Sequence, residues 1–255
     1  MKLDFRGLIS LDLKEHTTSI INNDDDEIIT FYISDKIGTQ STKNYTINNS
    51  DNQEILSDIY FVGKKHTDEK KKFIRDTFKS IDNLIDIDFK EVFDDNGSEI
   101  DIYNIESSTT FNENVAGQVI TQKTIFGSWT DIFWKDMGAQ NLESQENNNT
   151  IIHEIGHALG LSHPFDDPFN ESWSTDDTVM SYNKGVDNWN SNYTNNDLEA
   201  LISLWGREND DGKITLPEVK SLYKYKKENK NYYIKTNLGY ENITNIEKIL
   251  FPDGE

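Results

Sequence analysis

Apolar residues along this chain follow two different periods, and each period predicts a kind of secondary structure. The β-branched run Ile28–Ser34 predicts a buried strand. In Asp68–Leu84, apolar residues recur at three- and four-residue steps with lysines between them, which predicts an amphipathic helix. Four later stretches are expected to be strands and two to be helices: Ile85–Val92, Glu99–Ile105, Gly117–Thr121 and Asp131–Lys135, then about 148–160 and 195–205.

The order of these elements defines the expected fold class. One strand is followed by a helix, four strands and two helices, which indicates an α/β or α+β sandwich with a mostly single sheet. Of the two classes we expect α+β, with an N-terminal subdomain that is similar to α/β. The polar stretch at about 35–66 lies outside the expected elements.

Composition excludes several classes of protein. The chain has 255 residues, and 35% of them are hydrophobic, which is enough for a core and argues against disorder throughout. The net charge of -21 repels phosphate backbones, so nucleic-acid binding is not expected. No apolar run approaches the roughly 18 residues of a membrane span, so membrane insertion is not expected. The start at Met1–Leu11 lacks the continuous apolar stretch of a conventional signal peptide.

Cysteine usage and charge distribution narrow the picture further. There is no cysteine, which excludes disulfides, zinc ribbons and thiol nucleophiles. Residues 207–255 hold nine basic and nine acidic residues and are neutral, so residues 1–206 carry the whole net charge of -21. This shift in composition predicts a boundary near Gly206.

The segment HEIGHALGLSH carries the strongest chemical signal. His153 and His157 are four residues apart, so on a helix both imidazoles project from one face and can reach one metal ion. Gly160 permits the left-handed backbone that ends the helix, and His163 then returns as a third ligand. Three neutral imidazoles leave a fourth position open for water, as in catalytic zinc sites. Glu154 stands beside the ligands, close enough to contact that water.

A second signal follows at Met180, within the sequence DTVMSY. The two segments together resemble the zinc motif and the Met-turn of the metzincin metalloendopeptidases. Pro164, directly after the third histidine, and the form Met-Ser-Tyr of the turn are similar to the serralysin-like family. The resemblance covers about residues 25–206.

This resemblance implies a fold and a division of the chain. The expected fold has a mixed five-stranded twisted sheet, two long helices, an active-site cleft and a mostly irregular lower subdomain. The expected parts are an N-terminal extension or propeptide-like segment over 1–24, a metzincin catalytic domain over 25–206, and a charge-balanced appendage of unknown role over 207–255.

The resemblance also implies an activity, that of an extracellular, monomeric endopeptidase acting on protein or peptide substrates. One zinc ion is then held by the three histidines, and Glu154 is the general base for the attacking water. Tyr182 approaches the zinc and donates to the oxyanion, while Met180 packs beneath the imidazoles. The alternative is an inactive metzincin-fold binding module whose cleft is blocked, for example by the C-terminal tail.

Substrate is expected to lie extended along the cleft and to pair with an edge strand. The strand expected in this role comprises Gly117, Gln118, Val119, Ile120 and Thr121. Residues 164–179 are expected to form the wall of the pocket just past the scissile bond.

Two departures from the serralysin-like pattern concern calcium and export. The Gly-rich nonapeptide repeats that bind calcium in that family are missing, which also leaves the export route open. The tail contains one sequence that resembles half of an EF-hand loop, ending at Glu218, but Arg207 occupies the position of its first ligand. Calcium binding is therefore not expected.

The remaining candidate residues are interpreted as structural. His16 and His66 stand alone in polar contexts and are expected at the surface. The tryptophans are expected in the core or the cleft wall: Trp129, Trp134, Trp173, Trp189 and Trp205. The acidic residues between the two motifs are expected in a solvated loop: Asp166, Asp167, Asp176 and Asp177.

Overall fold

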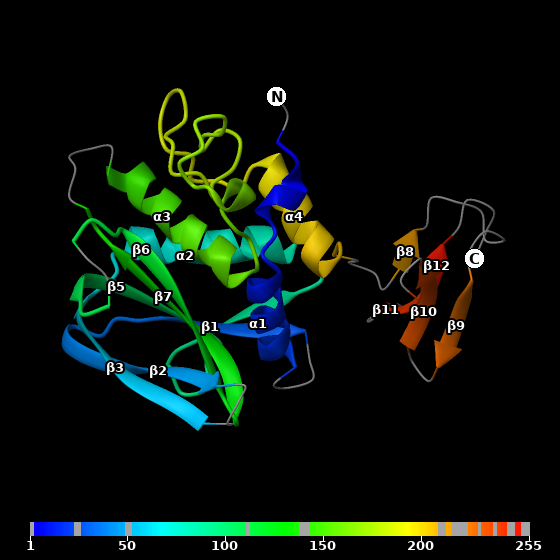
Figure 1. Cartoon of the computed structure of the whole chain (residues 1–255), viewed down its shortest axis with the longest axis horizontal. Helices are drawn as coiled ribbons and strands as arrows, with labels where there is room; N and C mark the ends of the chain where they lie inside the picture. The colour runs from blue at the N-terminus through cyan, green and yellow to red at the C-terminus, as the bar shows by residue number, and fades with distance from the viewer. Residues whose placement is uncertain are drawn as a thin grey trace. The chain divides into compact units, whose positions relative to one another are not determined.

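The computed structural model divides the chain into two units, Met1–Gly206 and Arg207–Glu255 (Figure 1). The division falls at the glycine where the charge composition changes. The structure describes residues 3–22, 27–48, 53–110, 113–137, 143–208, 213–215, 224–228, 231–236, 239–243 and 248–250.

The first unit is an α+β domain around a mixed seven-stranded sheet. Its strands are β1 (Ile28–Ile33), β2 (Gly38–Asn48), β3 (Gln53–Lys64), β4 (Asp88–Val92), β5 (Ile100–Ser108), β6 (Gly117–Thr124) and β7 (Gly127–Lys135). The strand β5 pairs in parallel with β1 and β7 and antiparallel with β3, while β4 extends the sheet from β1. The antiparallel partner of β7 is β6. The α+β class and the five strands expected from the sequence are confirmed.

The expected strand count of five was too low, because the polar stretch after β1 forms the hairpin β2–β3. These two strands pair antiparallel over their whole length, from Gly38 opposite Gly63 to Asn48 opposite Gln53. Apolar residues are sparse here, since only one face of β3 is covered. Ile59 is buried and the next residue, Tyr60, is 50% exposed.

Four α-helices and two short 3₁₀ turns, η1 and η2, lie within the described residues of the first unit. They are η1 (Phe5–Leu8), α1 (Leu11–Ile21), α2 (Asp68–Asp82), α3 (Glu143–Ala158), η2 (Pro164–Asp166) and α4 (Asn195–Trp205). The predicted apolar face of α2 is confirmed, with Ile74, Phe78 and Ile81 all buried. The helix α1 was not predicted, although Ser10 accepts a hydrogen bond from the Leu13 amide as its N-cap.

The N-terminal residues belong to the core of this unit. Leu8 and Ile20 are fully buried and Leu3 is 3% exposed, within the same cluster as β1 and α3. The segment expected as a propeptide-like extension therefore packs as part of the domain that carries the histidine motif.

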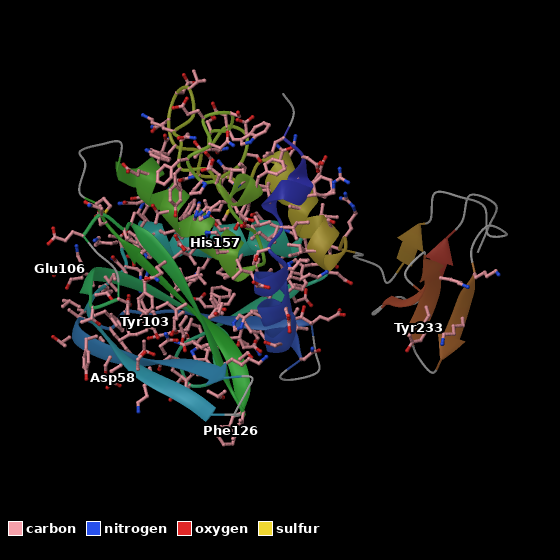
Figure 2. All side chains as sticks on the ribbon, viewed as in Figure 1. Asp58, Tyr103, Glu106, Phe126, His157 and Tyr233 are labelled. Carbon is pink, nitrogen blue, oxygen red and sulfur yellow. The ribbon has the colours of Figure 1, made fainter. Side chains whose placement is uncertain are left out.

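Two apolar clusters lie on opposite faces of the sheet. Ile100 and Ile102 of β5 face the helices, whereas Tyr103 and Ile105 face the hairpin β2–β3. Figure 2 shows Tyr103 among the side chains that fill this second layer, where its ring lies 5.2 Å from that of Phe61. Helices cover one face of the sheet and the hairpin covers the other (Figure 1).

Two isolated histidines expected at the surface are instead hydrogen-bonded inside the domain, so that expectation was wrong. His66 is 2% exposed. Its Nδ1 donates to the Ser34 carbonyl at 2.7 Å, and its Nε2 accepts from the Trp134 indole at 3.0 Å. His16 is half-buried, with Nε2 at 3.0 Å from the Trp129 carbonyl. The polar sequence around each histidine hid these long-range partners.

The described residues of the second unit lie mainly in short strands. The strands β9 (Tyr225–Glu228), β10 (Asn231–Thr236) and β11 (Gly239–Ile243) form an antiparallel sheet, and β8 (Lys213–Thr215) pairs in parallel with β12 (Lys248–Leu250). The sequence that resembles half an EF-hand loop lies largely outside the described residues, which omit 209–212 and 216–223. No helix within the described ranges has the length and apolar character needed to cross a membrane.

Candidate metal centre

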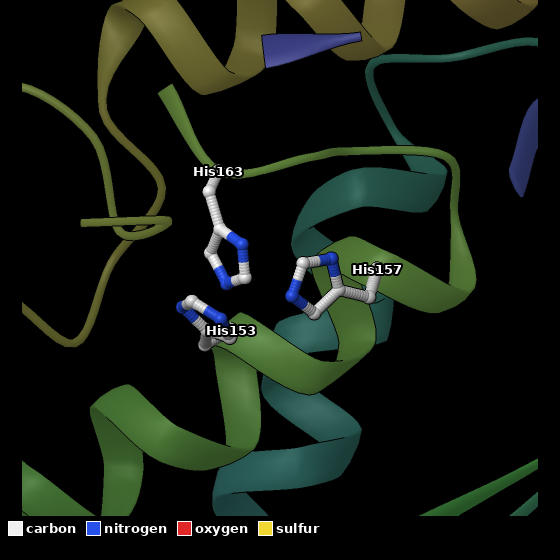
Figure 3. A group of neighbouring side chains, drawn as sticks. All are labelled: His153, His157 and His163. Carbon is white, nitrogen blue, oxygen red and sulfur yellow. The ribbon is translucent and has the colours of Figure 1, made fainter. Parts of the chain in front are cut away.

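Three histidines converge at the C-terminal end of α3. His153 and His157 project from one face of this helix, as their spacing predicts. The helix ends at Ala158, and Gly160 adopts the predicted left-handed backbone with φ of 97°. Figure 3 shows how the chain then reverses, so that the imidazole of His163 faces the other two. One nitrogen from each ring lies within 4.8 Å of the others, which is close enough to hold a metal ion together.

Backbone carbonyls fix the orientation of two of the rings. Nδ1 of His153 donates to the Val179 carbonyl at 2.9 Å, and Nδ1 of His157 donates to the Leu161 carbonyl at 2.8 Å. A proton on Nδ1 leaves the lone pair of Nε2 free for a metal. Nε2 of His153 and Nε2 of His163 are buried without a hydrogen-bond partner among the described residues. Two buried ring nitrogens without a hydrogen-bond partner are suited to bind a cation, so the three histidines fit a metal site.

Burial also sets the charge of the site. It lowers the pKa of His157 to about 4 and that of His153 well below its usual range, and the neighbouring imidazoles add to both shifts. Burial likewise lowers the pKa of His163. All three rings are therefore neutral near pH 7, which is the form that binds metals. Burial raises the pKa of Glu154 to about 8, and a cation beside this carboxyl group would favour its charged form.

Glu154 faces the first residue of β6. It is 5% exposed and belongs to α3, next to the first histidine. A Cβ atom added to Gly117 would lie 2.4 Å from Oε1 of Glu154. A side chain at position 117 would therefore displace the carboxyl group, so the glycine leaves Glu154 its place beside the cleft. The sequence placed Gly117 on an edge strand but gave no sign of this contact.

Tyr182 completes the ring of side chains around the histidines. Its ring centroid lies 4.9 Å from that of His163 and 5.3 Å from that of His153, and the residue is 43% exposed. Burial and the charge of Glu154 raise the pKa of Tyr182, so the phenol keeps its proton and can donate a hydrogen bond.

Met180 is fully buried beneath α3. A Cβ atom added to Gly156 would lie 2.8 Å from the Met180 sulfur, so this glycine in the last turn of α3 makes room for the turn at Met180. The turn is fastened by Asp197 in the first turn of α4, whose carboxylate accepts from the Thr178 hydroxyl at 2.5 Å and the Val179 amide at 3.1 Å. Asp197 thus supports the carbonyl that orients the first histidine. Sequence reasoning missed it, because only the capping pattern at Thr194 marks it.

The chain after the third histidine is strained. Phe165 and Asp166 have φ of 53° and 61°, the left-handed region that costs non-glycine residues of order 1–3 kcal/mol each. Of the expected wall residues 164–179, Phe169 lines the larger hollow beside the histidines. The acidic residues of this segment are exposed or half-buried, in keeping with a solvated loop.

Two hollows flank the histidines and together form a cleft. The larger, of about 460 Å³, is lined by His153, Glu154 and Tyr182, with Val115 and Trp189 among its apolar walls. The smaller, of about 310 Å³, follows β6 and is bounded by His157 and by Leu13 of α1. Gly117, Glu154 and Tyr182 line both hollows. Among the described strands, β6 pairs with β7 alone, so its other edge is open along the cleft.

The predicted site residues therefore come together in one place. His153 lines the larger hollow and His157 the smaller, Glu154 and Tyr182 line both, and His163 lies beside the other two imidazoles. Trp134 and Trp173 lie in the core, Trp205 packs against it, and Trp189 lines the larger hollow, as expected. Trp129 is half-buried against Tyr45, outside the two core clusters and the two hollows. Val115 and Leu13 were missed, because neither residue belongs to a motif.

Comparisons with known proteins add little to this geometry. No protein-family model matches the sequence, and no curated protein matches it. Among solved structures, the chain is similar to one described as the GM1-bound form of the ECX AB5 holotoxin. The two are 15% identical with a TM-score of 0.41, over 74% of this chain and 82% of that chain. At this level the likeness supports no conclusion about function.

Proposed function

We propose that the first unit is a zinc-dependent endopeptidase of the metzincin type, similar to the serralysin-like family. The observation that carries the proposal is the convergence of three neutral imidazoles beside Glu154, at a cleft bordered by an open strand edge. Imidazole ligands suit zinc, and three of them leave a position free for chemistry. When bound, zinc would polarise the scissile carbonyl and lower the pKa of water toward about 7.

Glu154 supplies the proton transfers in this proposal. Its carboxylate accepts a proton from water as the water oxygen attacks the carbonyl carbon, and then delivers that proton to the leaving amine. Burial in the cleft wall holds the group where few competing waters reach it. The Tyr182 hydroxyl donates a hydrogen bond to the carbonyl oxygen as negative charge develops there, and keeps its proton. Met180 and Asp197 position the histidines and take no part in bond making.

The open edge of β6 suits an extended peptide. Main-chain hydrogen bonds to an edge strand hold a substrate regardless of its side chains. In the antiparallel direction, residues before the scissile bond lie beside Val119 and Thr121, and residues after it enter the larger hollow near Val115. Gln118 supports this arrangement, because its buried Oε1 has no hydrogen-bond partner among the described residues and can accept from a peptide amide.

Digestion of casein by the full chain tests the proposal. Cleavage is expected with zinc, is lost on adding a chelator, and returns when zinc is restored. His163→Ala should lose both zinc and cleavage, whereas His16→Ala, an imidazole outside the cluster, should keep both. Casein that stays intact with one zinc bound per chain contradicts the proposal and favours a metzincin-fold binding module.

A further inference from the structure

The N-terminal segment runs alongside the chain reversal that joins the second and third histidines. The Ser162 amide donates to the Leu8 carbonyl at 2.7 Å, and the Ser10 amide donates to the Gly160 carbonyl at 3.0 Å. Between these bonds, Ile9 and Leu161 form an antiparallel bridge. Residues 8–10 therefore hold the reversal from outside the α3 segment.

The bridged reversal is the part of the chain that orients the ligands. The Leu161 carbonyl accepts the Nδ1 proton of His157 at 2.8 Å, so Ile9 pairs with the residue that sets the tilt of this ring. Ser162, whose amide is bonded to residue 8, directly precedes His163. Two of the three ligands thus depend on backbone that the N-terminal segment holds.

A second contact involves the chain just after His163 in the sequence. The ring of Phe165, whose backbone is in the left-handed region, packs directly on Gly7. A Cβ atom added to Gly7 would lie 2.6 to 2.8 Å from three atoms of that ring. No positive φ is found at Gly7, so the glycine is required for this close approach.

The segment itself is firmly anchored. Leu8 is fully buried, and the Thr17 hydroxyl of α1 donates to the Ala158 carbonyl at the end of α3 at 2.9 Å. The contacts at residues 7–10 are therefore held by the core on one side and reach the ligand backbone on the other.

We infer that residues 7–10 form an N-terminal clamp that positions His157 and His163 for metal binding. The N-terminal segment is then needed for a tight metal site, whereas a propeptide-like segment would inhibit and be removed. Cleavage within it would switch the site off. The inference rests on the metal centre of the proposed function but does not depend on peptide hydrolysis.

Zinc affinity measured by competition with a chelating dye tests the clamp in the full chain. Gly7→Ala should weaken zinc binding by about 10–100-fold, the usual effect of disturbing groups that orient metal ligands. Adding Phe165→Ala removes the ring that the new methyl group meets, so in that background Gly7→Ala should change affinity less than about threefold. Ile20→Ala is the control, since it loses core packing away from the clamp and should lower the melting temperature with zinc affinity unchanged.

Hydrogen exchange of the wild-type chain gives a second test that does not depend on a variant folding. If the clamp favours zinc binding, zinc must favour the clamp by the same factor. Exchange of the Ser10 and Ser162 amides should therefore slow when Zn²⁺ is added.

Three outcomes separate this inference from the proposed function. Unchanged exchange at both amides, or zinc affinity in Gly7→Ala within about threefold of wild type, overturns the clamp alone. A wild-type chain that binds zinc tightly and shows the clamp effects but leaves casein intact contradicts only the proposed function. A wild-type chain that binds no zinc overturns both.

Discussion

Replacing Gly117 by alanine tests how closely the cleft depends on the position of Glu154. The added methyl carbon would lie 2.4 Å from Oε1 and 2.8 Å from Cδ of that side chain. Ordinary contacts of this kind start at 3.4 Å, so the carboxyl group must retreat by about 1 Å. A misplacement of about 1 Å in a catalytic group costs on the order of 10²-fold in rate. We therefore expect kcat to fall by about 10²-fold.

The assay is steady-state hydrolysis of a fluorogenic peptide at measured zinc content. Zinc should remain at one per chain, because the three atoms nearest to a Cβ added at Gly117 all belong to Glu154 and not to a histidine. Lys123→Ala is the matched control, since Lys123 is exposed on the same strand, lines neither hollow, and should contribute little to kcat. In a Glu154→Asp background, where the carboxyl group is shorter by one methylene, Gly117→Ala should cost little more.

Two results would refute this reasoning. A kcat within about threefold of wild type would mean that the carboxyl group is not held where the structure has it. A large rise in KM with unchanged kcat would mean that the methyl group obstructs substrate, because Gly117 lines both hollows, without disturbing the base.

Further predictions concern the tyrosine, the anchor of the Met-turn and pH. Tyr182→Phe should lower kcat by less than about 10²-fold at full zinc occupancy, as for loss of one of two oxyanion contacts, and unchanged kcat would leave Tyr182 a packing residue. Asp197→Ala should cost ~3 kcal/mol of unfolding free energy in urea, from a lost cap and orphaned buried amides, whereas exposed Glu199→Ala should cost less than ~0.5 kcal/mol. Burial raises the pKa of Asp131 to about 7. The free energy of unfolding should therefore fall from about pH 4 to 7, because over that range only the unfolded chain loses this proton. In urea melts at several pH values, Asp131→Asn should flatten this dependence of the unfolding free energy on pH.

The sign of the pH prediction follows from which state holds the proton. Asp131 lies opposite Asp101 in the parallel pair β5–β7, and both are buried. Burial and the neighbouring carboxyl group raise the pKa of Asp101 to about 8. Both groups thus stay protonated in the folded chain at pH values where the unfolded chain has released them. An unchanged slope in Asp131→Asn would contradict this.

Sequence reasoning succeeded where a residue's role depends on near neighbours. Local periodicity or backbone conformation explains the apolar face of α2, the five predicted strands and the end of α3 just before Gly160. The convergence of His153 and His157 follows from helical spacing alone. His163 needed only the further assumption that the chain reverses after the glycine.

Sequence reasoning failed where the partners of a residue are distant in the sequence. The hairpin β2–β3 is polar because one of its faces is open, so its strands lack a strong hydrophobic signal. The polar sequence around His66 predicts a surface residue, but in the structure its ring is hydrogen-bonded to Ser34 and Trp134. Residues 7–10 show no motif, and their contact with the reversal after α3 spans about 150 residues of chain. Such long-range contacts are set by packing, which local patterns do not record.

Hydrolysis by Glu154→Ala at matched zinc content is the most direct test of the proposed endopeptidase. Glu154 borders the cleft beside the histidines, and in the proposed mechanism it contacts the attacking water and not the metal. The variant should therefore still bind one zinc per chain. Losing a general base costs on the order of 10²–10⁴-fold in rate. The account predicts that wild type cleaves the peptide and that Glu154→Ala, equally loaded with zinc, is slower by that factor. Equal rates for the two proteins, or zinc lost together with the activity, would contradict it.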